Sequence, residues 1–171
     1  MNKNNYAVIM AGGIGSRFWP MSKATLPKQF LDILGTGETL IQQTFRRLQK
    51  ICPAENILIV TNKNYKALCQ KQLADVVVKN ILCEPVMRNT APCVAYAAFK
   101  IHSENPDGNM IIAASDHIIT KEDEFVRVVN DCLELSAAND VLLTIGITPS
   151  RPDTGYGYIQ FTEKGLVGHK K

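Results

Sequence analysis

The sequence has few of the features that would place it in a membrane or on a nucleic acid. Its 171 residues contain no run of the roughly 20 apolar residues that a membrane span requires. The formal net charge is only +3, and the Lys and Arg residues are scattered, so they form no basic stripe. The apolar run after the polar segment Met1–Asn5 is too short for a signal peptide. We therefore expect a soluble protein with no membrane or nucleic-acid partner.

Paired cysteines, repeats and linkers are also missing. The five cysteines are odd in number and form no Cys-x-x-Cys pair, which argues against a disulfide framework or a zinc site. Reduced thiols in the cytoplasm are the expectation. The chain contains no internal repeat, low-complexity tract or linker-like stretch, and its 46% hydrophobic content is enough for one core. We expect a single domain.

Apolar runs typical of buried strands alternate with helical patterns, as in a mostly parallel α/β sheet with helices on both faces. Strands are predicted at 6–10, 56–61, 109–114 and 141–147, and a weaker one at 79–83. Helices are predicted over 40–48, from about 91 to 99 and over 122–137. The apolar stripes expected to face the core are Leu40, Ile41, Thr44, Phe45 and Leu48, then Ala91, Val94, Ala95, Ala98 and Phe99, then Phe125, Val128, Val129, Cys132 and Leu133.

A glycine-rich loop follows the first predicted strand. Its candidate nucleotide-binding residues are Ala11, Gly12, Gly13, Gly15 and Ser16. Glycines let the backbone approach a phosphate and point N–H donors at it, and Arg17 and Lys28 supply positive charge. The loop lacks both the Gly-Lys-Ser/Thr of a Walker motif and the third glycine of a dinucleotide fingerprint. Ordinary tight-turn chemistry is the alternative interpretation.

Asp116 follows the strand predicted at 109–114. In a parallel sheet it reaches the same edge as the glycine loop, where a carboxylate can bind Mg²⁺ together with substrate phosphates. The alternative is an aspartate that caps the next turn. We interpret the neighbouring His117 as a hydrogen-bonding residue of the loop and leave it out of the catalytic set.

Separate motifs in the right order resemble a known family. Gly13-x-Gly15-x-Arg17, followed by Pro27-Lys28, resembles the signature of the sugar-1-phosphate nucleotidyltransferases. The segments 18–22, 84–92 and 154–159 are similar to those of its mannose-1-phosphate guanylyltransferase branch, and the resemblance runs from about 6 to 161. It implies a Rossmann-like nucleotide-diphospho-sugar transferase fold. It also implies guanylyl transfer from GTP to mannose 1-phosphate, with Mg²⁺, giving GDP-mannose and pyrophosphate.

The resemblance also implies roles for single residues. Arg17 would hold the leaving pyrophosphate, Lys28 would neutralise phosphate charge, and Asp116 would bind the metal. The implied guanine-side residues are Glu84, Arg88, Asn89 and Thr90, and the implied sugar-side residues are Gly155, Tyr156 and Gly157. Simpler interpretations stay open, because Asn89 or Thr90 can cap a helix and residues 155–158 can form a β-turn before a strand at 158–161.

The sequence departs from the family pattern in two places. Ala114-Ser115 stand where Pro-Ala is common, and neither a second metal-binding aspartate nor a Phe-Val-Glu-Lys-Pro-like segment occurs before Lys171. We therefore expect residues 1–171 to be the N-terminal part of a single, truncated catalytic domain. Such a piece would have an open sheet edge, would tend to form homo-oligomers and would turn over little alone. The alternatives are a uridylyl- or thymidylyltransferase and a non-catalytic nucleotide-binding module.

Overall fold

The structure is a computed structural model that describes residues 2–15 and 18–160. The chain forms two units, residues 1–141 and residues 142–171. All helices and strands described lie in the first unit. None of the helices in the described ranges is both long and apolar enough to cross a membrane.

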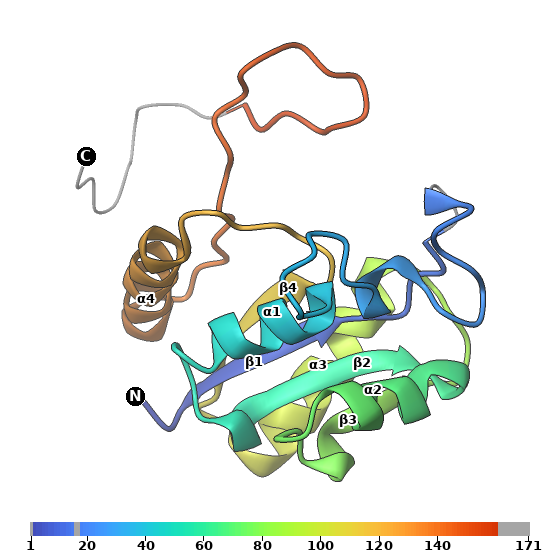
Figure 1. Cartoon of the computed structure of the whole chain (residues 1–171). Coiled ribbons are helices and arrows are strands. Elements are labelled where there is room, and N and C mark those ends of the chain that lie inside the picture. The colour runs from blue at the N-terminus through green and yellow to red at the C-terminus, as the bar shows by residue number, and fades with distance from the viewer. Residues whose placement is uncertain (1, 16–17, 161–171) are drawn as a thin grey trace. The chain divides into compact units, whose positions relative to one another are not determined.

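A four-stranded parallel sheet forms the centre of the first unit (Figure 1). Its strands are β1 (Asn5–Met10), β2 (Ile57–Asn62), β3 (Ile81–Glu84) and β4 (Asn109–Ala114), in the order β3-β2-β1-β4. β1 pairs with β2 on one side and with β4 on the other, where Met10 lies opposite Ala114. Because the strands are parallel, their carboxyl ends meet at one edge of the sheet. The loops that carry the predicted site begin there.

Helices cover both faces of this sheet, as the sequence predicts. α1 (Leu40–Leu48), α2 (Lys66–Gln72) and α4 (Glu122–Ala138) pack on one face, and α3 (Thr90–Glu104) packs on the other (Figure 1). Short 3-10 turns at Lys28–Phe30, Ala54–Asn56, Lys63–Tyr65 and Val78–Asn80 complete the connections.

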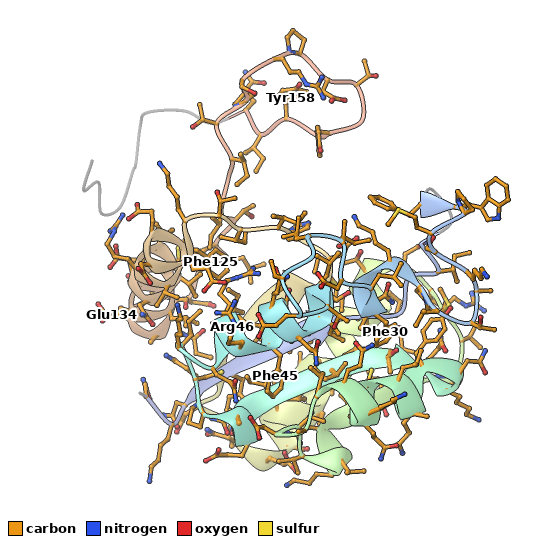
Figure 2. The ribbon with its side chains drawn as sticks, in the orientation of Figure 1. Phe30, Phe45, Arg46, Phe125, Glu134 and Tyr158 are labelled. Carbon is orange, nitrogen blue, oxygen red and sulfur yellow. The ribbon has the colours of Figure 1, made fainter. Side chains whose placement is uncertain are left out.

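Two apolar clusters separate these layers. Because successive side chains of a strand point to opposite faces, Ala7 and Ile9 of β1 join the cluster under α1, α2 and α4, whereas Val8 joins the cluster under α3. Phe45 of α1 is buried in the first cluster (Figure 2). The central strand is therefore buried on both faces, which explains its nearly continuous apolar sequence.

Most of the predicted elements are confirmed, but the strand predicted at 141–147 is wrong. These residues have no regular secondary structure, and Leu142 and Ile147 are exposed. An apolar run forms a strand only where a neighbouring strand pairs with its backbone. Residues 158–160 form no strand either, and Phe161 lies outside the described residues. The short helix α2 was not predicted, because Cys69 is its only buried residue.

The stripe predicted for α3 is also wrong. The buried residues of this helix are Cys93, Ala97 and Ile101, whereas Phe99 is 76% exposed. Small apolar residues occur on several sides of this helix, so periodicity alone does not select the packed face. The stripe predicted for α1 is confirmed in full. In α4, Val129 and Leu133 are buried as predicted, and Phe125 packs at the edge of the core.

The five cysteines are free thiols. Burial raises the pKa of Cys52 and Cys69 to about 12 and that of Cys93 to about 11. The buried thiols therefore stay protonated at neutral pH and act as small core side chains.

Candidate functional site

The glycine loop is held where it leaves β1. The backbone N–H of Ala11 donates to the carbonyl of Val60 over 2.8 Å, and the Ala11 carbonyl accepts from the Thr61 hydroxyl over 2.9 Å. Ala11 and Thr61 are fully buried. The start of the loop is therefore an extension of the β1–β2 pairing, and its direction is set by the sheet.

Gln29 holds the next part of the loop. Its side-chain amide donates to the carbonyls of Ala11 and Gly13, over 3.1 and 2.9 Å. The residue is only 4% exposed and lies in the short turn that also carries Lys28. The sequence analysis assigned no role to Gln29, although its position directly after Lys28 could have pointed to one. One side chain thus ties the glycine loop to the lysine segment.

The three glycines of the loop differ in whether the surrounding protein leaves room for a side chain. Gly15 has a φ of +64°, and a Cβ there would lie 2.9 Å from the backbone nitrogen of Lys28. A Cβ at Gly12 would make ordinary contact, 3.5 Å from Oε2 of Glu84, and one at Gly13 would meet no atom of the described residues within 4 Å. Packing therefore demands glycine at Gly15, but not at Gly13.

Lys28 and Asp116 meet at the carboxyl edge of the sheet. The Lys28 Nζ lies 3.4 Å from Oδ2 of Asp116, and the two side chains are 21% and 41% exposed. Asp116 is carried there by β4, because the N–H of the preceding Ser115 donates to the Met10 carbonyl over 3.2 Å. The Lys28 ammonium also lies 4.3 Å from the centre of the Phe18 ring. The predicted placement of Asp116 at the edge of the sheet that carries the glycine loop is confirmed, and its contact with Lys28 is a further finding of the structure.

Glu84 ends β3 at the same edge. It is half-buried beside Gly12, and burial raises the pKa of its carboxyl group. Arg88, Asn89 and Thr90 follow in an exposed loop and first helical turn. Asn89 occupies the N-cap position of α3 with a φ of 65°, but its side chain makes no capping hydrogen bond. Glu84 therefore lies beside the glycine loop at Gly12, and the other predicted base-side residues lie at the surface.

The other predicted site residues are either outside the described residues or in the second unit. Ser16 and Arg17 lie outside the described residues. Gly155, Tyr156 and Gly157 belong to the second unit, and the Tyr156 side chain is 74% exposed. His117 is exposed, and its ring forms no hydrogen bond with a described residue.

The segment around Gly155 is organised by its own polar contacts. The carboxylate of Asp153 accepts from the N–H of Gly155 over 2.9 Å and pairs with Arg151 over 3.2 Å. The N–H of Asp153 donates to the hydroxyl oxygen of Tyr158, over 2.8 Å. These contacts close the chain into a compact loop that presents the two glycines and Tyr156.

Asp116 is the candidate metal ligand. Residues 2–15 and 18–160 bring together no group of three or more His, Cys, Asp or Glu side chains that could hold a metal. Mg²⁺ is often bound through one or two carboxylates together with substrate phosphates and water. A single, partly exposed carboxylate beside a lysine therefore fits a metal that is shared with the phosphates of a substrate.

Comparisons with known proteins agree with these features. The family model described as nucleotidyl transferase matches residues 6–169. The mannose-1-phosphate guanylyltransferase of Escherichia coli strain K12 is 41% identical over 91% of this chain and 33% of its own length. That of Salmonella typhimurium is also 41% identical, over 95% of this chain and 34% of its own length. The chain thus spans about a third of these curated relatives.

Two solved structures have a similar fold. A Thermus thermophilus protein titled mannose-1-phosphate geranyltransferase matches with a TM-score of 0.67 and 28% identity, over 77% of this chain and 38% of its own. A Helicobacter pylori protein titled mannose-6-phosphate isomerase matches with a TM-score of 0.60 and 20% identity, over 78% of this chain and 47% of its own. The second likeness bears on the fold alone.

The glycine geometry predicts a ranked loss of stability. Gly15→Ala should lower the free energy of unfolding by about 2 kcal/mol or more, because it combines a positive φ with a backbone clash. Gly35→Ala has a similar φ of +66°, but no atom of the described residues lies within 4 Å of the added Cβ, so it should cost about 1–2 kcal/mol. Gly13→Ala should change stability by less than about 1 kcal/mol. Urea denaturation measures all three, and equal losses at Gly15 and Gly13 would contradict the ranking.

Gln29 gives a second prediction. Gln29→Glu places acceptor oxygens against two carbonyls, so it should destabilise the protein by about 1–3 kcal/mol at neutral pH. The buried carboxyl would have a raised pKa in the folded state, so this deficit should be smallest below the ordinary glutamate pKa of about 4.3 and should grow as the pH rises. Gln70→Glu, at an exposed position of α2, is the control. The stability of each variant relative to the wild type is measured by urea denaturation at several pH values. A loss of stability in Gln29→Glu that does not change with pH would argue against the two hydrogen bonds.

Proposed function

Since this chain belongs to the nucleotidyl transferase family, we propose that it serves the transfer of a guanylyl group from GTP to mannose 1-phosphate. The products are GDP-mannose and pyrophosphate. The observation that carries this proposal is the approach of Lys28 and Asp116, 3.4 Å apart, beside the glycine loop. A cation and an acidic metal ligand at one point are what a reacting polyphosphate requires.

The glycine loop is proposed to bind the triphosphate. At Gly13 no atom within residues 2–15 and 18–160 accounts for the missing side chain, and a bare backbone lets a phosphate approach closely. Gln29 supports this role by holding two loop carbonyls away from the incoming anion. Arg17 and Ser16 keep the roles predicted for them in binding pyrophosphate and nucleotide.

The reaction joins a phosphate oxygen of mannose 1-phosphate to the α-phosphorus of GTP. The bond from that phosphorus to the oxygen bridging the α- and β-phosphates breaks, and its electrons leave with pyrophosphate. No covalent enzyme intermediate is needed, because positioning and charge neutralisation account for most of such a transfer. Lys28 would neutralise the reacting phosphates, and Asp116 would hold Mg²⁺. The ion, when bound, supplies charge compensation for the phosphates.

We propose that residues at the end of β3 select the base. Guanine presents two N–H donors on one edge, and the Glu84 carboxylate is an acceptor placed beside the loop at Gly12. Its burial raises the pKa of the carboxyl group. Hydrogen bonds from the two N–H donors of guanine would stabilise the charged carboxylate and so offset this effect of burial. Arg88, Asn89 and Thr90 are proposed as further contacts from the start of α3.

The sugar is assigned to the second unit. Gly155, Tyr156 and Gly157 offer backbone N–H groups and an aromatic face, which suit a hexose ring. The compact loop held by Asp153 presents them together. The family match runs from 6 to 169 and crosses the boundary between the two units, which supports the proposal that both are parts of one catalytic domain.

Nucleotide titration tests the proposed function. Trp19 is the only tryptophan of the chain and lies just after the glycine loop, so its fluorescence should respond to nucleotide. With Mg²⁺, GTP should bind about tenfold more tightly than UTP or CTP, because a pyrimidine leaves pocket groups unpaired at about 1–3 kcal/mol each. ATP should also bind more weakly than GTP, since its base lacks the donor pair. Pyrophosphate release from GTP and mannose 1-phosphate is measured as well, and it should be slow, as expected for a truncated catalytic domain.

Glu84→Gln should reduce the preference for GTP and leave the Mg²⁺ requirement unchanged. Glu55→Gln, in the turn before the amino end of β2, is the matched control and should change neither. Equal affinity of the wild-type chain for GTP and UTP would exclude guanylyl transfer and would favour the uridylyl alternative. No response to any of the four triphosphates would exclude the nucleotide site itself.

A further inference from the structure

Asp116 lies in a loop, residues 115–121, whose two ends are held in different ways. At the β4 end, the buried Ser115 is fixed by its hydrogen bond to Met10 of β1. At the other end the loop runs directly into α4, whose first residue is Glu122. The position of the Asp116 carboxylate therefore depends on where α4 begins as well as on the sheet.

Glu122 joins the start of α4 to α1 and to the turn after α1 through three cations. Its carboxylate accepts from Nη1 and Nη2 of Arg46 over 3.0 and 3.1 Å, and from Nζ of Lys50 over 3.1 Å. The Nε of Arg47 lies 3.7 Å away. These bonds lower the pKa of the Glu122 carboxyl group, with Arg46 the largest cause. Figure 2 labels Arg46 on α1 and Phe125 on α4, the two helices that this cluster joins.

The cluster continues into the core through Arg47. This side chain is 4% exposed, its Nε has no hydrogen-bond partner among the described residues, and its guanidinium lies 5.6 Å from the centre of the Phe125 ring. A buried cation of this kind needs an anion nearby. Among the described residues, Glu122 is the anion that lies within 4 Å of it, so the contact is specific to this carboxylate and not a general surface attraction.

The other end of α1 reaches the lysine side of the site. The N–H of Leu40, the first residue of α1, donates to the carbonyl of Leu31, which directly follows the Lys28–Phe30 turn. Gln72 ties the same turn to α1, because its amide donates to the Phe30 carbonyl and its backbone carbonyl accepts from Gln42. α1 is thus bonded to the segment that carries Lys28 and, through Glu122, to the helix that follows Asp116.

We infer that Glu122 is a positioning residue for Asp116, because its contacts with Arg46, Arg47 and Lys50 hold the start of α4, and so the Asp116 loop, at a fixed distance from Lys28. The inference rests on the proposed function, in which Asp116 and Lys28 act on the same phosphates. Glu122 itself touches neither substrate nor metal.

The test compares Glu122→Gln with Glu124→Gln. Both changes remove one negative charge from the first turn of α4, but Glu124 pairs only with Arg127 of its own helix, over 2.7 Å, among the residues that the structure describes. Arg46→Met is a second variant, which removes one cation and leaves the buried Arg47 with its anion. Three measurements are made: amide hydrogen exchange of the peptide covering 115–121, the Mg²⁺ concentration that half-saturates the Trp19 response to GTP, and the melting temperature.

In Glu122→Gln, exchange of the 115–121 peptide should be faster by about tenfold, and the half-saturating Mg²⁺ concentration should rise about tenfold, as for residues that orient a ligand. Arg46→Met should shift both in the same direction by less. Glu124→Gln should match the wild type in both, whatever its melting temperature.

Other outcomes separate this inference from the proposed function. Unchanged exchange in Glu122→Gln would overturn the inference. So would faster exchange with an unchanged Mg²⁺ dependence, because Glu122 would then be only structural. A wild-type chain that does not respond to GTP would refute the proposed function instead, and the exchange measurement would then decide whether Glu122 fixes the loop.

Discussion

The parallel pairing of β1 with β2 and β4 is the constraint on which the site depends. It buries β1 on both faces and brings the ends of three strands to one edge of the sheet. The same backbone ladder continues past the strands, as Ala11 bonds to Val60 and Ser115 bonds to Met10. The glycine loop and Asp116 are therefore extensions of the core, and their separation is set by strand geometry instead of loop preference.

Around this frame, side chains add the second level of positioning. Gln29 links the glycine loop to the lysine turn, and Glu122 links the helix after Asp116 to α1. The Gln29 hydrogen bonds are wholly or partly removed from water, where losing one partner is costly, whereas the Glu122 hydrogen bonds to Arg46 are exposed and act together with the contact to the buried Arg47. Gly15 belongs to the same group, because the close passage of Lys28 leaves no room for a Cβ. Gly13 differs, since its need for glycine comes from a ligand in the proposed function.

Local patterns predict much of the fold and of the site. The buried strands, the α1 stripe and the place of Asp116 at the edge that carries the glycine loop follow from apolar periodicity and from the rule that parallel strands end together. The prediction of a strand at 141–147 is wrong because an apolar run does not specify which strand will pair with it. The prediction of the packed face of α3 is wrong because its alanines form no clear apolar stripe. The roles of Gln29 and Glu122 depend on contacts between distant segments, which a single sequence does not display.

The most direct test of the site is a double-mutant cycle of Lys28→Met and Asp116→Asn, measured as GTP affinity in the presence of Mg²⁺. If both side chains act on the same phosphates, the double variant should lose less than the two single losses combined, with a coupling of about 0.5–3 kcal/mol. The pair Lys28→Met and Glu104→Gln, the latter at the far end of α3, should be additive. Additive losses for Lys28 and Asp116 would contradict a shared site.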